Sequence, residues 1–123
     1  MKKSFSSVSA PKTKSVMDLT QESVHTSDNK DIGDIEAVNK DSIVVKRGFK
    51  NVHYYYVPIR EVKGWDEHVV WLKIPEGDVI AKYQRTEEPD RSKYFTKEHG
   101  YSDVDVRNMN TIDLPNIDVI SNQ

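Results

Sequence analysis

The side chains best suited to metal or acid–base chemistry are the four histidines, His25, His53, His68 and His99. None has another histidine three or four positions away, the spacing that places two ligands on one helix face. His68 closes the triplet Asp66-Glu67-His68, but neighbouring side chains at the start of a strand point to opposite sides. The chain also lacks a glycine-rich phosphate loop and a Gly-x-Ser-x-Gly nucleophile turn. We therefore expect no metal site, no cofactor and no enzymatic activity.

A stretch of interleaved aromatic and basic residues could support binding instead. The aromatic residues are Phe49, Tyr54, Tyr55, Tyr56, Trp65 and Trp71, and the basic ones are Lys46, Arg47, Lys50, Arg60, Lys63 and Lys73. Aromatic rings can stack on single-stranded bases while cations hold phosphates. Acidic residues in the same stretch weaken its positive field, and about half of the rings are needed to fill a core. Exposed Tyr, Trp and Arg are also typical of protein interfaces.

The favoured function is therefore a non-catalytic protein-interaction or adaptor module. The predicted interface residues are Tyr54, Tyr56, Trp71, Arg60, Ile112, Leu114 and Ile117. The alternative is an RNA- or ribosome-associated factor that uses the same aromatic residues with Arg47, Lys50 and Lys63. The sequence does not identify the protein partner.

The elements that would position these residues are short strands separated by turn residues. The apolar runs 32–38, 42–46, 53–59 and 68–74 are rich in Val, Ile, Tyr and Trp, with a weaker run at 22–26. Their spacing predicts antiparallel neighbours rather than strand–helix–strand units. Pro58 cannot donate a ladder hydrogen bond, so its strand should end, bulge or lie at an edge there. An unpaired edge near Pro58 would allow a homodimer.

Alternation predicts which side chains share a face. Val70 and Leu72 should lie on one face of their strand, and Trp71 on the other. Tyr55 should likewise lie opposite Tyr54 and Tyr56. Because both faces of these strands are partly apolar, we expect a strongly curved sheet or small barrel with one side covered by a tail or a partner. Residues 75–83 carry the signals of one short helix, with a proline at its start and acids near its N-terminus.

The two ends of the chain differ from this centre in composition. Residues 1–16 carry four lysines and no acid, which predicts a disordered basic arm. Residues 17–85 are expected to form the β domain. Residues 86–123 read as an acidic, largely disordered tail, whose apolar segment 112–120 could add as an edge strand in cis or in trans.

Two segments resemble a known family. The run Asp28-Asn29-Lys30-Asp31-Ile32-Gly33-Asp34-Ile35-Glu36-Ala37-Val38 is similar to the opening of a PRC-barrel domain, and Tyr55-Tyr56-Val57-Pro58-Ile59-Arg60-Glu61-Val62 followed by Val69-Val70-Trp71-Leu72 is similar to a later element. Asn29 stands where the family usually has Gly, although Asn also tolerates left-handed backbone angles. The resemblance covers about residues 22–83. It implies a mainly β fold, a small antiparallel barrel of about six strands with one short C-terminal helix and flexible tails, that docks onto other macromolecules.

Composition sets the remaining limits. The chain has 123 residues, a formal net charge of −2 and 31% charged residues, a balance that excludes a strongly basic nucleic-acid binder. It has no cysteine, which excludes disulfides and thiolate chemistry and fits a reducing, cytoplasmic location. No apolar run approaches the roughly 18 residues of a membrane span, and the N-terminus lacks the apolar stretch of a signal peptide.

Overall fold

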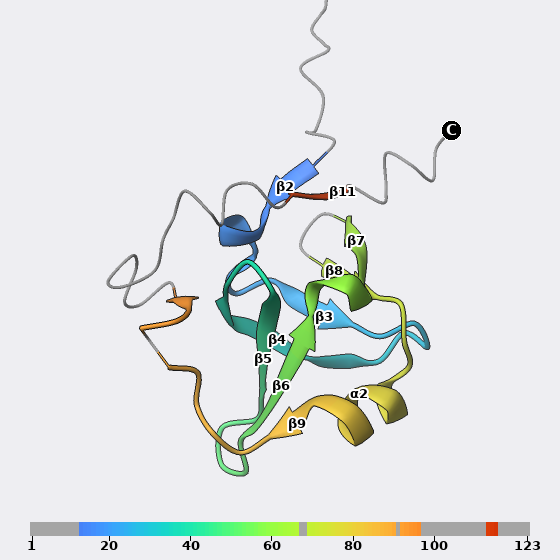
Figure 1. The fold of residues 1–123 in the computed structure, drawn as a ribbon. Coiled ribbons are helices and arrows are strands. Elements are labelled where there is room, and N and C mark those ends of the chain that lie inside the picture. The colour runs from blue at the N-terminus through green and yellow to red at the C-terminus, as the bar shows by residue number, and fades with distance from the viewer. Residues whose placement is uncertain (1–12, 67–68, 91, 97–112, 116–123) are drawn as a thin grey trace, which may run out of the picture.

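A computed structural model describes residues 13–66, 69–90, 92–96 and 113–115. Most of the strands join one strongly curved, eight-stranded sheet (Figure 1). Its strands are β3 (Ser23–His25), β4 (Asp31–Val38), β5 (Ser42–Arg47), β6 (His53–Pro58), β7 (Val62–Asp66), β8 (Val69–Leu72), β9 (Gln84–Arg85) and β10 (Phe95–Thr96). A second, two-stranded sheet pairs β2 (Thr13–Ser15) with β11 (Asp113–Pro115).

Three short helices connect these strands in the part of the chain that the structure describes. They are the 3-10 helices η1 (Val16–Leu19) and η2 (Ile59–Glu61) and the α-helix α2 (Glu76–Tyr83). The predicted mainly β fold with one short α-helix is confirmed. As expected from Pro58, β6 ends at that residue and η2 follows. No helix of the described residues is long and apolar enough to cross a membrane.

The order of the strands departs from a simple antiparallel barrel. The main path runs β7-β8-β3-β4-β5-β6-β9, with β10 added on β4. Among the described residues this path is open, with β7 and β9 at its two ends. The expectation of antiparallel pairing throughout is wrong for one pair, because β8 lies parallel to β3. Strand β8 pairs with β7 in a hairpin and with β3 on its other side. Strands β3 and β8 are far apart in the sequence.

The main core lies inside the curve of the sheet and follows the predicted alternation. Val70 and Leu72 of β8 are buried, and Tyr55 of β6 is the largest of the fully buried side chains. Trp71 is half-buried on the opposite face of β8. Burying these side chains removes apolar surface from water, which is the main driving force for folding.

The turn between β3 and β4 fixes the start of α2. Asn29 adopts a left-handed φ of 61°, the conformation that asparagine tolerates in turns. The Asp28 carboxylate accepts hydrogen bonds from the Thr26 hydroxyl and, at 3.2 Å, from the backbone N–H of Glu76. The Thr26 hydrogen bond is the main cause that lowers the pKa of Asp28. The Glu76 carboxylate in turn accepts a 2.7 Å hydrogen bond from the Arg47 guanidinium of β5.

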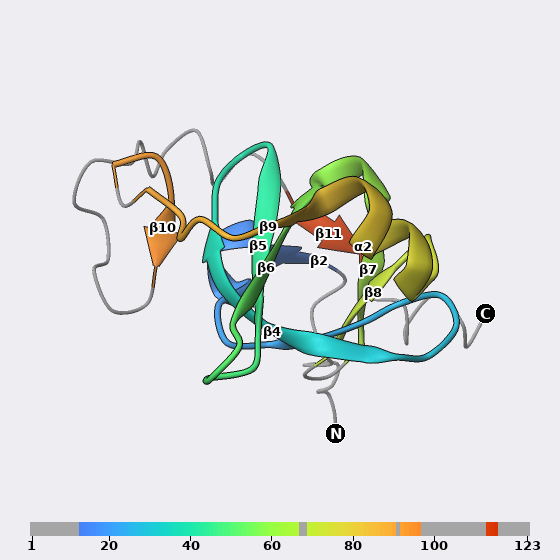
Figure 2. The same cartoon turned by 90° about the horizontal axis from the view of Figure 1, so that it is seen from below.

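The folded unit extends past the predicted domain boundary at residue 85. Phe95 and Thr96 form β10 on Val38 and Ala37 of β4, and the Asn39 amide donates to the Lys93 carbonyl at 3.4 Å. Figure 2 shows β10 on the opposite side of the molecule from β7, β8 and α2. Part of the segment predicted as a disordered tail therefore adds a strand to the sheet.

Two described segments that are far apart in the sequence also pair. Residues 13–15 of the predicted basic arm form β2, which pairs antiparallel with residues 113–115 of the predicted edge-strand segment 112–120. Strand β11, formed by residues 113–115, lies beside β7 (Figure 1). The part of this segment that the structure describes thus pairs in cis, with β2. Residues 112 and 116–120 lie outside the described residues.

Candidate interaction surface

The three aromatic residues predicted to share a contact face do not form one exposed surface. Tyr54 is 6% exposed and packs in a second apolar cluster with Ala37 and Val44 on the outer face of the sheet. Its predicted role as an exposed contact is therefore wrong. Trp71 lies on β8 and contacts a different ring, that of His25, edge to face with 5.1 Å between the ring centroids.

Tyr56 is held by the segment that follows β9. Its hydroxyl donates a 2.7 Å hydrogen bond to the Glu87 carbonyl, and its ring meets that of Tyr94 edge to face at 6.1 Å between centroids. Both rings pack against the cluster that contains Tyr54. The sequence allowed a tail or a partner to cover the apolar outer face. Over this part of the sheet, Glu87 and Tyr94 of the chain itself do so.

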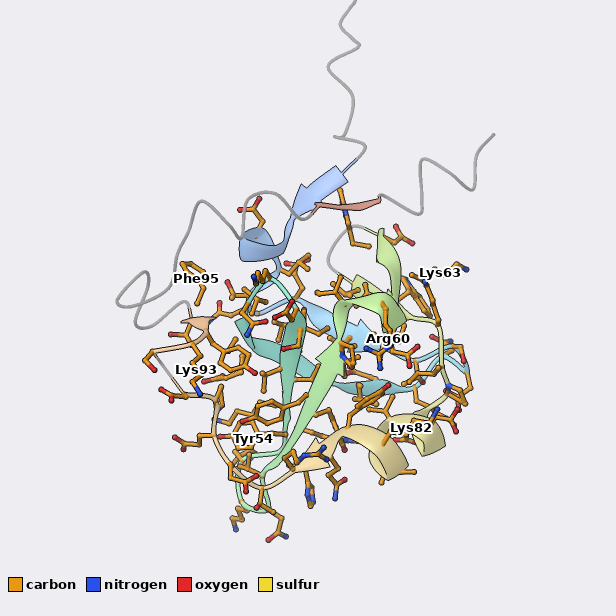
Figure 3. All side chains as sticks on the ribbon, in the orientation of Figure 1. Tyr54, Arg60, Lys63, Lys82, Lys93 and Phe95 are labelled. Atoms are coloured by element: carbon orange, nitrogen blue, oxygen red, sulfur yellow. The ribbon has the colours of Figure 1, made fainter. Side chains whose placement is uncertain are left out.

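The remaining predicted interface residues lie elsewhere. Arg60 is exposed on η2, and Figure 3 shows it on the side of β7, away from Tyr54, which lies toward β9. Leu114 belongs to β11, while Ile112 and Ile117 lie outside the described residues. Lys63, proposed for RNA binding, is on β7 and far from the turn that carries Lys50. The predicted interface residues that the structure describes therefore do not lie together on one surface.

Among the described aromatic residues, a different one has the greatest exposure. Phe49 lies in the turn between β5 and β6, and 88% of its surface is exposed. It borders an open hollow of about 640 Å³ between this turn and β4. Such a volume lies in the range of small-ligand or side-chain binding sites, about 300–1,000 Å³. Sequence reasoning counted Phe49 among the aromatic residues but did not choose it for the interface.

The hollow is shaped by a close approach of two strands. The floor includes Gly33 of β4, which has a φ of 123°. A Cβ atom at this position would lie 2.2 Å from the Lys46 carbonyl oxygen, so only glycine allows the backbone of β5 to lie so close at the end of their antiparallel pairing. Gly48, with a φ of 86°, then turns the chain toward Phe49. These two glycines place the ring at the rim of the hollow.

The polar lining of the hollow is mostly acidic. Asp31, Asp34 and Glu36 come from β4, and Lys46 from β5, which gives formal charges of three carboxylates against one ammonium. The Asp31 carboxylate accepts the Gly33 N–H at 2.9 Å, and the Ser23 hydroxyl donates to the Asp34 carboxylate at 3.3 Å. Two of the carboxylates are thus oriented by the fold. A phosphate group would meet unfavourable charge here.

Comparisons with known protein families, curated proteins and solved structures found no match to this chain. The candidate surface therefore has to be judged from its own chemistry. Within the part of the chain that the structure describes, no group of three or more His, Cys, Asp or Glu side chains could hold a metal ion. Glu67 and His68 of the predicted triplet lie outside that part. What the hollow offers is an apolar ring beside carboxylates.

The covering segment can be tested through the titration of Tyr56. Burial, followed by the proximity of Tyr94 and Glu87, raises the pKa of Tyr56 from 10.0 to about 12. Between these pH values the native phenol keeps its proton while the unfolded one loses it, so unfolding becomes more favourable as pH rises. The contribution of this group is present below pH 10 and is lost as pH rises toward 12. Tyr56→Phe should therefore lose less stability between about pH 8 and about pH 11 than the parent in urea unfolding. Equal losses in the two proteins would contradict the half-buried position of this side chain beside the segment that follows β9.

Proposed function

We propose that this chain is a non-catalytic protein-interaction module on a PRC-barrel-like β domain, and that its partner docks on Phe49 and the adjoining hollow. The observation that carries the proposal is the 88% exposure of Phe49 at the rim of that hollow. Burying a phenylalanine side chain contributes about 1.5–3 kcal/mol. Because Phe49 is exposed in the folded chain, this free energy of burial is available to a partner that covers the ring.

The position of Phe49 supports binding rather than folding. It is in a turn, outside both apolar clusters, so its removal leaves the core intact. Aromatic side chains that fill pockets at the centre of an interface supply much of the binding energy in protein complexes. A neighbouring hollow gives the partner a place to insert a side chain of its own.

The alternative of an RNA-associated factor has weaker support. Its cations are dispersed: Arg47 is paired with Glu76 at 2.7 Å, and Lys63 is on β7. Lys50 follows Phe49 directly, but the hollow beside the ring presents carboxylates. Nucleic-acid binding that depends on phosphate contacts falls steeply with salt, so one experiment separates the two functions.

Phe49→Ser is expected to weaken capture of the partner at least about 10-fold, equivalent to 1.4 kcal/mol of binding energy. The full chain would be immobilised and exposed to native lysate at low and high salt, with protein and nucleic acid both quantified in the eluates. Ile80→Ser is the matched control, because Ile80 is the other exposed large apolar residue of the described residues, at 42%. Trp71→Ser in the same assay tests whether the interface extends to β8.

The expected result is a discrete protein that the parent and Ile80→Ser retain at high salt and that Phe49→Ser loses. Equal retention by Phe49→Ser would contradict the proposed site. Recovery of RNA that washes off with salt, without a retained protein, would favour the alternative function.

A further inference from the structure

We infer that the partner segment that docks beside Phe49 carries a lysine or arginine side chain, which enters the hollow. This inference rests on the proposed function and adds the chemistry of the partner. It is drawn from three properties of the same site: an exposed aromatic ring, a hollow large enough for a long side chain, and a lining with more negative than positive charge.

The ring and the carboxylates lie at different parts of the hollow. Phe49 is on the turn after β5, whereas Asp34 and Glu36 are on β4. Lysine and arginine have the matching amphipathic form, because their aliphatic stem packs on apolar surface while the charged end stays near polar groups. A cation within about 6 Å of an aromatic face gains a further attraction. An acidic or phosphorylated segment would have only Lys46 of the lining to pair with.

The local structure also keeps the carboxylates available to a ligand. Asp34 is exposed and Glu36 half-buried, and the Ser23 hydroxyl engages only one oxygen of Asp34 among the hydrogen bonds described for it. Lys46 is the Cα partner of Asp34 across the β4–β5 ladder, so part of the charge is balanced within the site. A cationic side chain would reduce the remaining excess of negative charge in the lining.

The test uses the full-length chain and three five-residue peptides that differ at two positions: Ac-Gly-Lys-Leu-Lys-Gly-NH₂, the same peptide with two glutamines in place of the lysines, and the same with two glutamates. Binding would be followed by amide chemical shifts of the isotope-labelled protein. The lysine peptide should shift the amides of Gly33, Gly48 and Phe49, and bind at least about fivefold more tightly than the glutamine peptide at low salt, with the difference shrinking as salt rises. The glutamate peptide should bind more weakly than either.

The double variant Asp34→Asn/Glu36→Gln should reduce the preference for lysine over glutamine to less than about twofold. Glu87→Gln/Glu88→Gln removes the same net charge from the segment after β9 and should leave the preference unchanged. Asp31 is kept in both variants because its carboxylate holds the Gly33 N–H.

The outcomes separate the inference from the proposed function. If lysine and glutamine peptides bind equally at Phe49, or the glutamate peptide binds best, the cationic preference is wrong while the site stands. Failure of all three peptides to shift these amides would overturn the inference, and partner capture by Phe49→Ser then decides the proposed function independently. Loss of the preference for lysine over glutamine in both double variants alike would also overturn the inference. The preference would then depend on the net charge of the protein and not on the carboxylates of the hollow.

Discussion

Gly33→Ala is expected to lower the free energy of unfolding by about 2–6 kcal/mol, the sum of a strained backbone conformation and of overpacking between the added Cβ and strand β5. The φ of 123° is one that residues with a side chain rarely adopt. The added Cβ would also lie 2.2 Å from the Lys46 carbonyl oxygen and 3.2 Å from the Arg47 Cα. Both are backbone atoms of β5, so relief requires the strands to separate. Urea unfolding of the purified variant measures the loss.

Gly77→Ala is the matched control for this substitution. Gly77 is in α2, and a Cβ there would meet nothing within 4 Å. Alanine has the higher helix propensity, so this variant should gain about 0.5–1 kcal/mol. If Gly33→Ala unfolded at the same urea concentration as the parent, the backbone of β5 would not lie as close to Gly33 as described, and the hollow would be shaped differently.

Tyr55→Ala is expected to cost about 3–5 kcal/mol, as for other large aromatic side chains removed from a core. Tyr55 is 2% exposed, and its strand pairs with β5 on one side and β9 on the other. Removing the ring leaves a cavity between strands that the ladders hold in place. Thermal or urea unfolding measures the effect, and the variant should be the least stable of the substitutions considered apart from Gly33→Ala.

The conservative change Tyr55→Phe separates packing from hydrogen bonding. It removes only the hydroxyl, which accepts a 3.4 Å hydrogen bond from the Arg47 guanidinium. The expected cost is about 0.5–1.5 kcal/mol, because that guanidinium keeps its hydrogen bond to Glu76. A loss as large as that of Tyr55→Ala would mean that the hydroxyl, and not the ring, sets the contribution of this residue.

Local pattern was enough to predict much of the fold. Alternation placed Val70 and Leu72 on one face of β8 and Tyr55 opposite its two neighbouring tyrosines, because a strand presents successive side chains to opposite faces. The structure buries Tyr55, Val70 and Leu72 in the main core. Pro58 marked the end of β6 for the equally local reason that proline lacks an N–H. The apolar character of both faces also predicted a covered outer face.

Long-range pairing could not be predicted in the same way. Nothing in residues 23–25 indicates that β3 pairs in parallel with β8, because the choice depends on how the whole sheet curves. Tyr54 was expected to be exposed, but the segment that ends in β10 packs over its neighbours. That segment is polar and carries few apolar residues, so its composition resembles a disordered tail.

The sequence contains one indication of the candidate site that was not used to predict it. Phe49 follows a glycine and lies in a stretch of turn residues between two strands, and loop residues at a turn have little core to pack against. A large apolar residue at such a position is therefore expected to be exposed. The acidic lining of the hollow could not have been foreseen. The β4–β5 register and the close contact of Gly33 with β5 bring these carboxylates beside the turn.

Photo-crosslinking from position 49 tests most directly whether a protein partner docks at this turn. The full chain would carry benzoylphenylalanine in place of Phe49, with a second protein carrying it in place of Ile80 as the exposed control. Each would be irradiated in native lysate at high salt. We expect a crosslink from position 49 to one discrete protein, which excess unlabelled parent chain abolishes and Phe49→Ser does not. Equal crosslinking from position 80, or competition by Phe49→Ser as effective as by the parent, would contradict it.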